Sequence, residues 1–168
     1  MMRRRIMTRT KLLGALAVGC GSVLVVASQI GSPSRLSKDL RAHLEEERFR
    51  IVTSLRGLPL GVREELQRLF GSPTLDIAEP GAEFQSTTAT PTLPSRRLIL
   101  AGCSADHHCV VYYERGGGTR SWRVALFHWR PAETRFEGGG VAPHDLGSLE
   151  DVRQALLSGA IKDAGKVW

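Results

Sequence analysis

The residues of this sequence best suited to chemistry lie in one short segment, Cys103 to Cys109, which reads CSADHHC. It brings two thiols, two imidazoles and one carboxylate close together in the chain. Groups of these types can pair as a disulfide, bind a soft or borderline metal ion, or supply a nucleophile and its base. Each of these three chemistries needs a different compartment and a different supporting structure.

A disulfide between Cys103 and Cys109 is the interpretation that we favour. The third cysteine, Cys20, lies in an apolar N-terminal segment with the pattern of an export signal. In an oxidising compartment the two cysteines that remain pair most simply with each other. Closing so short a loop contributes about 2 kcal/mol to stability through the unfolded chain.

Two other readings of the segment remain as alternatives. Zinc accepts thiolate and imidazole, so His107 and His108 could hold a metal ion; against this, neighbouring residues are cramped as ligands, and no second CxxC or HExxH motif accompanies them. A catalytic Cys thiolate with His107 or His108 as its base would need a free thiol where oxidation is favoured. The sequence therefore favours a protein with no catalytic residue, no metal and no cofactor.

The N-terminus has the pattern of an export signal. Residues 3–11 carry five basic side chains and no acid, and residues 12–30 follow without a single charge. A basic flank before an apolar run is typical of a secretory signal, and this run is close to the roughly 20 residues that span a bilayer as a helix. Residues 12–30 either anchor the chain in the membrane or are removed by cleavage near Ala27. Both cases export the rest to the periplasmic or extracellular face.

The net charge of +6 comes almost entirely from this N-terminal segment. Subtracting its five basic residues from the 23 Lys and Arg of the chain leaves 18 against 17 Asp and Glu, a net of +1. Binding of nucleic acid requires a concentrated basic face. We therefore expect no nucleic-acid partner; a protein partner fits better, with membrane contact only through residues 12–30 if they are retained.

Residues 31–75 are predicted to be helical. Apolar residues at three-to-four spacing predict a helix over 38–56, capped by Ser37, and a shorter helix over 61–70. The pair either forms an α-hairpin or extends a membrane stalk. On the first helix His43 lies beside three glutamates, which is typical of a solvent-exposed face. Residues 76–95, rich in Thr and Pro, are expected to be a linker or a long surface loop.

Residues 96–168 are predicted to form an α+β domain. Segments rich in β-branched and aromatic residues predict three strands, at 97–103, 109–114 and 120–129. A fourth short strand is expected near 134–137, with the three glycines at 138–140 as a turn. A capping pattern from Ser148 to Asp151 predicts a C-terminal helix that packs across one face of an antiparallel meander.

The hairpin from Leu98 to Glu114 resembles that of the bacterial periplasmic inhibitors of vertebrate-type lysozyme. In that family a disulfide-closed loop, Cys-x-x-His-x-Cys, joins two strands, and its histidine enters the lysozyme cleft. The loop here is one residue longer and lacks the family's Lys-Pro pair. The resemblance implies that His107 or His108 would be the inserted residue, with Asp106 beside it.

Taken together, these patterns predict an exported, non-catalytic binding domain. The loop residues Asp106, His107 and His108 are its expected binding surface, because a small covalent ring lowers the entropic cost of ordering them against a partner. A lysozyme inhibitor and a metal-binding protein that uses His107 and His108 are the alternatives. The sequence does not identify the partner or the oligomeric state.

Overall fold

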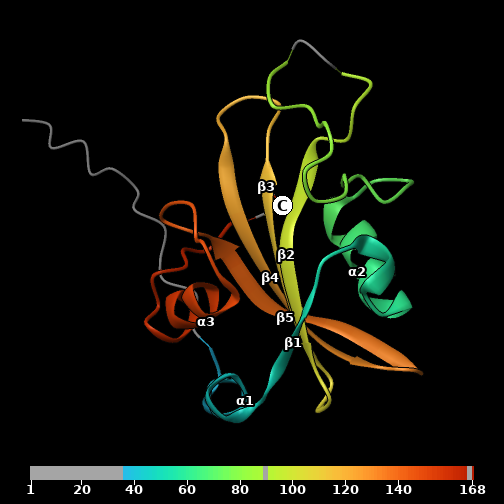
Figure 1. Ribbon diagram of the computed structural model, residues 1–168. Helices are drawn as coiled ribbons and strands as arrows, with labels where there is room; N and C mark the ends of the chain where they lie inside the picture. Colours follow the sequence, from blue (N-terminus) through green and yellow to red (C-terminus); the bar gives the residue numbers. More distant parts are fainter. Residues whose placement is uncertain (1–35, 89–90, 166–167) are drawn as a thin grey trace, which may run out of the picture.

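A five-stranded antiparallel sheet forms the centre of the protein (Figure 1). The computed structural model describes residues 36–88, 91–165 and 168. The strands lie side by side in chain order: β1 Phe49–Val52, β2 Arg96–Ser104, β3 His108–Arg115, β4 Ser121–Arg130 and β5 Glu133–Val141. The α+β class and the antiparallel meander are therefore confirmed. The export segment predicted at 12–30 lies outside the described residues, within which no helix is both long and apolar enough to cross a bilayer.

The helix predicted over 38–56 is wrong in its second half. Helix α1 (Lys38–Glu46) begins at Ser37, whose hydroxyl accepts a hydrogen bond from the Leu40 N–H, and it ends where Glu47 turns extended. The chain then forms β1, which pairs antiparallel with β2 at the edge of the sheet. Ile51 and Val52, which the predicted helix included on its apolar side, therefore belong to β1. Pairing with β2 satisfies the backbone of this short segment.

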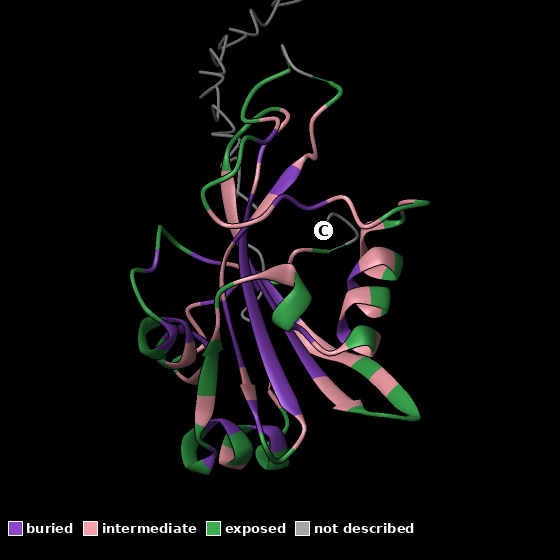
Figure 2. Ribbon diagram, turned by 45° about the vertical axis from the view of Figure 1, so that its right-hand side comes forward, coloured by how far each residue is buried: buried purple, intermediate pink, exposed green. Residues whose placement is uncertain are grey.

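Helices cover both faces of the sheet and produce two apolar cores (Figures 1 and 2). Helices α1 and α3 (Leu149–Leu157) lie on one face, and α2 (Leu60–Phe70) lies on the other. Alternate strand residues point to opposite faces, so Val110 and Tyr112 join the first core and Val111 and Tyr113 join the second. Both N-terminal helices therefore pack on the sheet.

The segment between α2 and β2 is attached to the sheet near both of its ends. Ala78 forms a bridge with Arg97 of β2, and Phe84 is buried. The Asp76 carboxylate accepts hydrogen bonds from the Ser95 N–H at 2.8 Å and from the Ser95 hydroxyl at 2.5 Å. The described part of 76–95 is therefore a long, packed surface loop.

The three glycines expected to form a turn instead continue β5. A Cβ at Gly139 would lie 2.0 Å from the Val124 carbonyl oxygen, and one at Gly140 would lie 1.8 Å from that of Lys162. Gly139 also has φ +145°, a conformation that L side chains rarely adopt. The glycines therefore allow β4 and the chain around Lys162 to approach β5 closely.

Candidate functional site

The predicted disulfide between Cys103 and Cys109 is present. The two residues are direct partners across β2 and β3, with their Cα atoms 4.1 Å apart. The bond therefore closes the hairpin at the last strand pair before its turn. Both sulfur atoms lie on the α2 face of the sheet.

The three residues expected to form the binding surface of this loop point in different directions. Asp106 is exposed. His107 has φ 72° and packs edge-on against the Trp129 ring at a centroid distance of 5.1 Å. His108 is only 4% exposed and lies on the α1 face. His108 is therefore not available at the tip of the loop; it contacts Glu47 on the α1 face, whereas His107 packs against Trp129.

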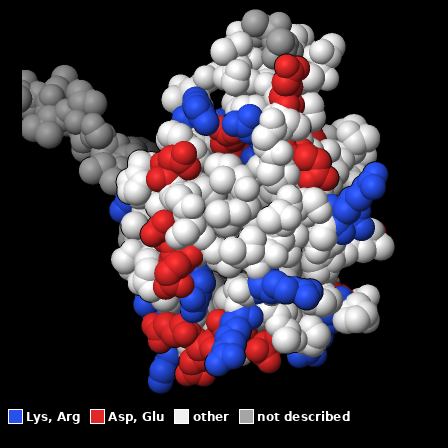
Figure 3. All heavy atoms as spheres, in the orientation of Figure 1, with Lys and Arg blue, Asp and Glu red and all other residues white. Residues whose placement is uncertain are grey.

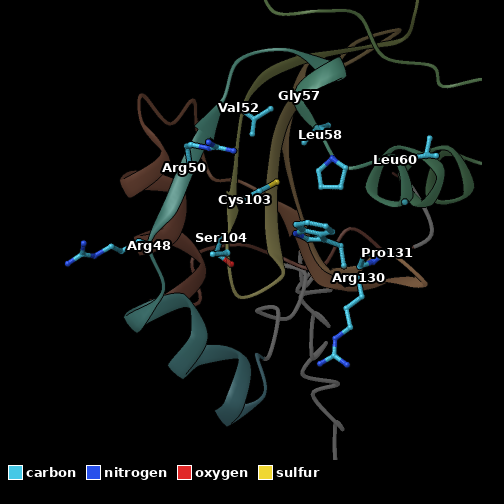
Figure 4. Close-up of a pocket in the computed structure, with 14 residues that line it drawn as sticks. Arg48, Arg50, Val52, Gly57, Leu58, Leu60, Cys103, Ser104, Arg130 and Pro131 are labelled. Carbon is cyan, nitrogen blue, oxygen red and sulfur yellow. The ribbon is translucent and has the colours of Figure 1, made fainter.

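A cleft of about 810 Å³ lies beside the hairpin on the α2 face (Figure 4). β1 and the preceding residue, Arg48, form one wall of the cleft. The end of β2, with Cys103 of the disulfide, forms a second wall. The segment from Gly57 to Gly61 and the end of β4 complete the lining. Four separate stretches of the chain therefore build this cleft, and the sequence gives no sign that they meet.

The cleft combines an apolar interior with a basic rim. Val52, Leu58 and Trp129 supply apolar surface, and the lining residues include three arginines and no acid among those that the structure describes. Arg50 points across the cleft, whereas the side chains of Arg48 and Arg130 extend outward from its two sides (Figure 4). These charges have no counter-charge in the lining.

Unpartnered polar groups add to this picture. In the described part of the chain, no ion pair or hydrogen bond engages the guanidinium groups of Arg48, Arg50 or Arg130. The indole N–H of Trp129 and Nδ1 of His107 are buried without a hydrogen-bond partner among the described residues. A buried polar group without a partner costs free energy, so this edge of the cleft is less well satisfied than the core.

Basic and acidic side chains are mixed on the face of the molecule seen in Figure 3. No continuous basic surface covers that face, and its central part carries few charges. The described lining of the cleft carries three arginines and no acid, which suits a small anion rather than a polyanion.

A second cluster, formed by His43, Glu47 and His108, lies on the opposite face of the sheet. Oε1 of Glu47 is 2.7 Å from Nδ1 of His43 and 2.7 Å from Nδ1 of His108. Oε2 of Glu47 accepts a hydrogen bond from the Ser104 hydroxyl at 2.5 Å. Glu47 is 7% exposed, so the interpretation of its segment as a solvated helix face is wrong at this residue. The four-residue spacing of His43 and Glu47 indicates in the sequence that the two side chains can meet on a helix. No sequence pattern indicates their contact with His108.

His128 borders this cluster. It is the direct partner of His108 across β3 and β4, and their rings are 5.0 Å apart between centroids. Burial lowers the pKa of His128, and the charges of His108, Arg130 and Arg135 lower it further. His128 is therefore neutral at pH 7 and adds no positive charge beside the cluster.

Comparison with models of protein families, with curated proteins and with solved structures finds no match to this chain.

Proposed function

We propose that the protein is an exported, non-catalytic binding domain whose cleft holds a small amphipathic molecule with an anionic head group. The observation that supports this most directly is the cleft lining, in which Arg50 points across apolar surface and Arg48 and Arg130 flank it, with no acid among the described lining residues. The volume of about 810 Å³ lies within the range of roughly 300–1,000 Å³ typical of small-molecule sites.

The chemistry of the lining fits each part of such a ligand. Guanidinium groups bind carboxylate and phosphate through paired, charge-assisted hydrogen bonds. The aliphatic and indole surfaces of Leu58 and Trp129 would cover an apolar body.

Binding fits the cleft better than catalysis does. Cys103 is held in the disulfide, and the Ser104 hydroxyl donates to Glu47 on the other face of the sheet. The described lining residues thus offer no nucleophile paired with a base. The disulfide and the N-terminal basic-apolar pattern both support export to an oxidising compartment, where such a domain would act released or anchored.

Arg50 is expected to bind the anionic head group of the ligand. We expect dodecanoate to bind the full-length protein and Arg50→Glu to weaken this binding by at least about tenfold, because a charge-assisted hydrogen bond is worth about 1.5–3 kcal/mol. Isothermal titration calorimetry would measure both affinities. Lys38→Glu makes the same change in charge at an exposed site on α1, and it should bind as the wild type does.

Dodecanol provides the comparison that tests the anionic head. It has the same chain without the charge, so it should bind much more weakly than dodecanoate. Equal binding of the two ligands, or an equal loss of dodecanoate binding in Arg50→Glu and Lys38→Glu, would contradict the proposal.

Inhibition of vertebrate-type lysozyme is a second candidate. The observation that favours it is the disulfide-closed turn between β2 and β3, which carries the exposed Asp106 and the half-buried His107. On this hypothesis the protein slows lysozyme in a turbidity assay, and His107→Ala loses most of that inhibition. His144→Ala changes an exposed histidine in another loop and should inhibit fully. A wild-type protein without any effect on lysozyme would remove this candidate.

A further inference from the structure

We propose that His43, Glu47 and His108 form a binding site for a divalent transition-metal ion such as Zn²⁺. Ligand atoms of these three side chains all lie within 4.8 Å of one another. Two imidazole nitrogens and one carboxylate oxygen form a donor set that zinc uses when it also binds a water molecule. This site is independent of the cleft, because the sheet separates them.

The fold brings the three ligands together from two elements. His43 and Glu47 lie one turn apart at the end of α1, where the Glu47 N–H donates to the His43 carbonyl at 3.0 Å. His108 is the first residue of β3, 61 positions after Glu47. The packing of α1 on the sheet therefore fixes the helical pair over the strand residue.

Ser104 orients the carboxylate of Glu47. Its hydroxyl donates to Oε2, which leaves Oε1 facing both Nδ1 atoms. A hydrogen bond that holds a ligating side chain in place is a regular feature of metal sites, and it raises their affinity. The carboxylate charge also offsets part of the positive charge of a bound ion.

The present spacing is close to what zinc requires. Each Nδ1 is 2.7 Å from Oε1, whereas ligand atoms about 2.1 Å from a tetrahedral zinc are roughly 3.4 Å apart. The cluster must therefore open slightly. The His43 side chain is 49% exposed, so it can make most of this movement, while Glu47 and His108 stay buried.

The protons of the two imidazoles must lie away from the bound ion. Each neutral imidazole would offer the lone pair of Nδ1 and carry its proton on Nε2, so no oxidant or reductant is needed. Three protein ligands leave a fourth position for water on the exposed side, next to His43. Cys103 and Cys109 do not compete for the ion, because they form the disulfide.

The test is a Zn²⁺ titration of the full, oxidised chain against a chromophoric chelator. We expect one equivalent to bind, and His43→Ala to weaken binding by at least about 100-fold, the upper end of what loss of an outer-shell partner costs. Glu47→Gln should weaken it as well. His144→Ala removes a histidine outside the cluster and should leave the affinity unchanged.

Three further measurements complete the test. Because His43 is half exposed, His43→Ala should fold normally, and circular dichroism can check this. Zn²⁺ should raise the Tm of the wild type and not that of His43→Ala. Arg50→Glu should bind Zn²⁺ as the wild type does, which separates this proposal from that for the cleft. A wild type that binds no Zn²⁺, or a folded His43→Ala that binds it equally well, would overturn the inference.

Discussion

Replacing Glu114 with alanine is expected to lower the free energy of unfolding by about 3 kcal/mol, because it removes the buried partner of two arginines. The Glu114 side chain is 1% exposed. Its Oε1 accepts from Nε of Arg97 at 2.6 Å, and its Oε2 accepts from Nε of Arg120 at 2.7 Å. Both guanidinium groups also contact the same oxygens through a second nitrogen.

The position of Arg97 extends the effect beyond the ion pair. Arg97 donates to the Ala82 carbonyl at 3.2 Å, and its guanidinium lies 4.6 Å from the centre of the Phe84 ring. Glu114 therefore holds the arginine that fastens the loop between α2 and β2. Without the carboxylate, the cations of Arg97 and Arg120 face each other across β3. The loop between α2 and β2 then loses one of its attachments to the sheet.

Chemical denaturation would measure the loss at Glu114, and a thermal melt should show a Tm lower by roughly 6–12 °C. Glu83→Ala removes an exposed carboxylate from the same loop, and it should change stability by no more than about 0.5 kcal/mol. The arginines are 28% and 53% exposed, so rehydration limits the cost. A Glu114→Ala protein within about 1 kcal/mol of the wild type would show that water replaces the carboxylate fully.

The elements that sequence patterns predicted well are those with local signals. Three strands of the meander occur within one residue of their predicted bounds, because a high content of β-branched and aromatic residues is a property of each segment alone. The C-terminal helix begins as expected, with the Ser148 hydroxyl accepting from the Asp151 N–H at 3.1 Å. The disulfide followed from a count of cysteines and an assumed compartment.

The features that sequence patterns missed depend on contacts between distant segments. Residues 49–52 form a strand only because β2 lies beside them, and the glycines of β5 serve close backbone approaches rather than a turn. The burial of Glu47 needs His108 and Ser104, which follow it by 61 and 57 positions. Helical spacing from the buried Leu40 and Leu44 reaches Glu47, but a carboxylate in this place is expected at the surface unless its distant partners are known.

The disulfide between Cys103 and Cys109 is expected to stabilise the fold. Changing both Cys103 and Cys109 to alanine is expected to lower the free energy of unfolding by about 2 kcal/mol, since the cross-link restricts the unfolded chain, and the cavity left at Cys109 adds to the loss. Cys109 is fully buried in the α2-side core. Denaturation of the oxidised wild type, the reduced wild type and the double variant would measure each contribution. Cys20→Ser, the matched control, should be as stable as the wild type.

The disulfide should also affect the cleft, since Cys103 and the two residues that follow it form part of its lining. The bond joins this wall to β3 and thereby fixes its distance from Trp129 and Arg130 on β4. We therefore expect the double variant to bind dodecanoate several-fold more weakly than Cys20→Ser, because part of the binding energy must then order the hairpin end. Unchanged binding in a destabilised double variant would show that strand pairing alone fixes the wall. Unchanged stability would instead contradict a structural role for the cross-link.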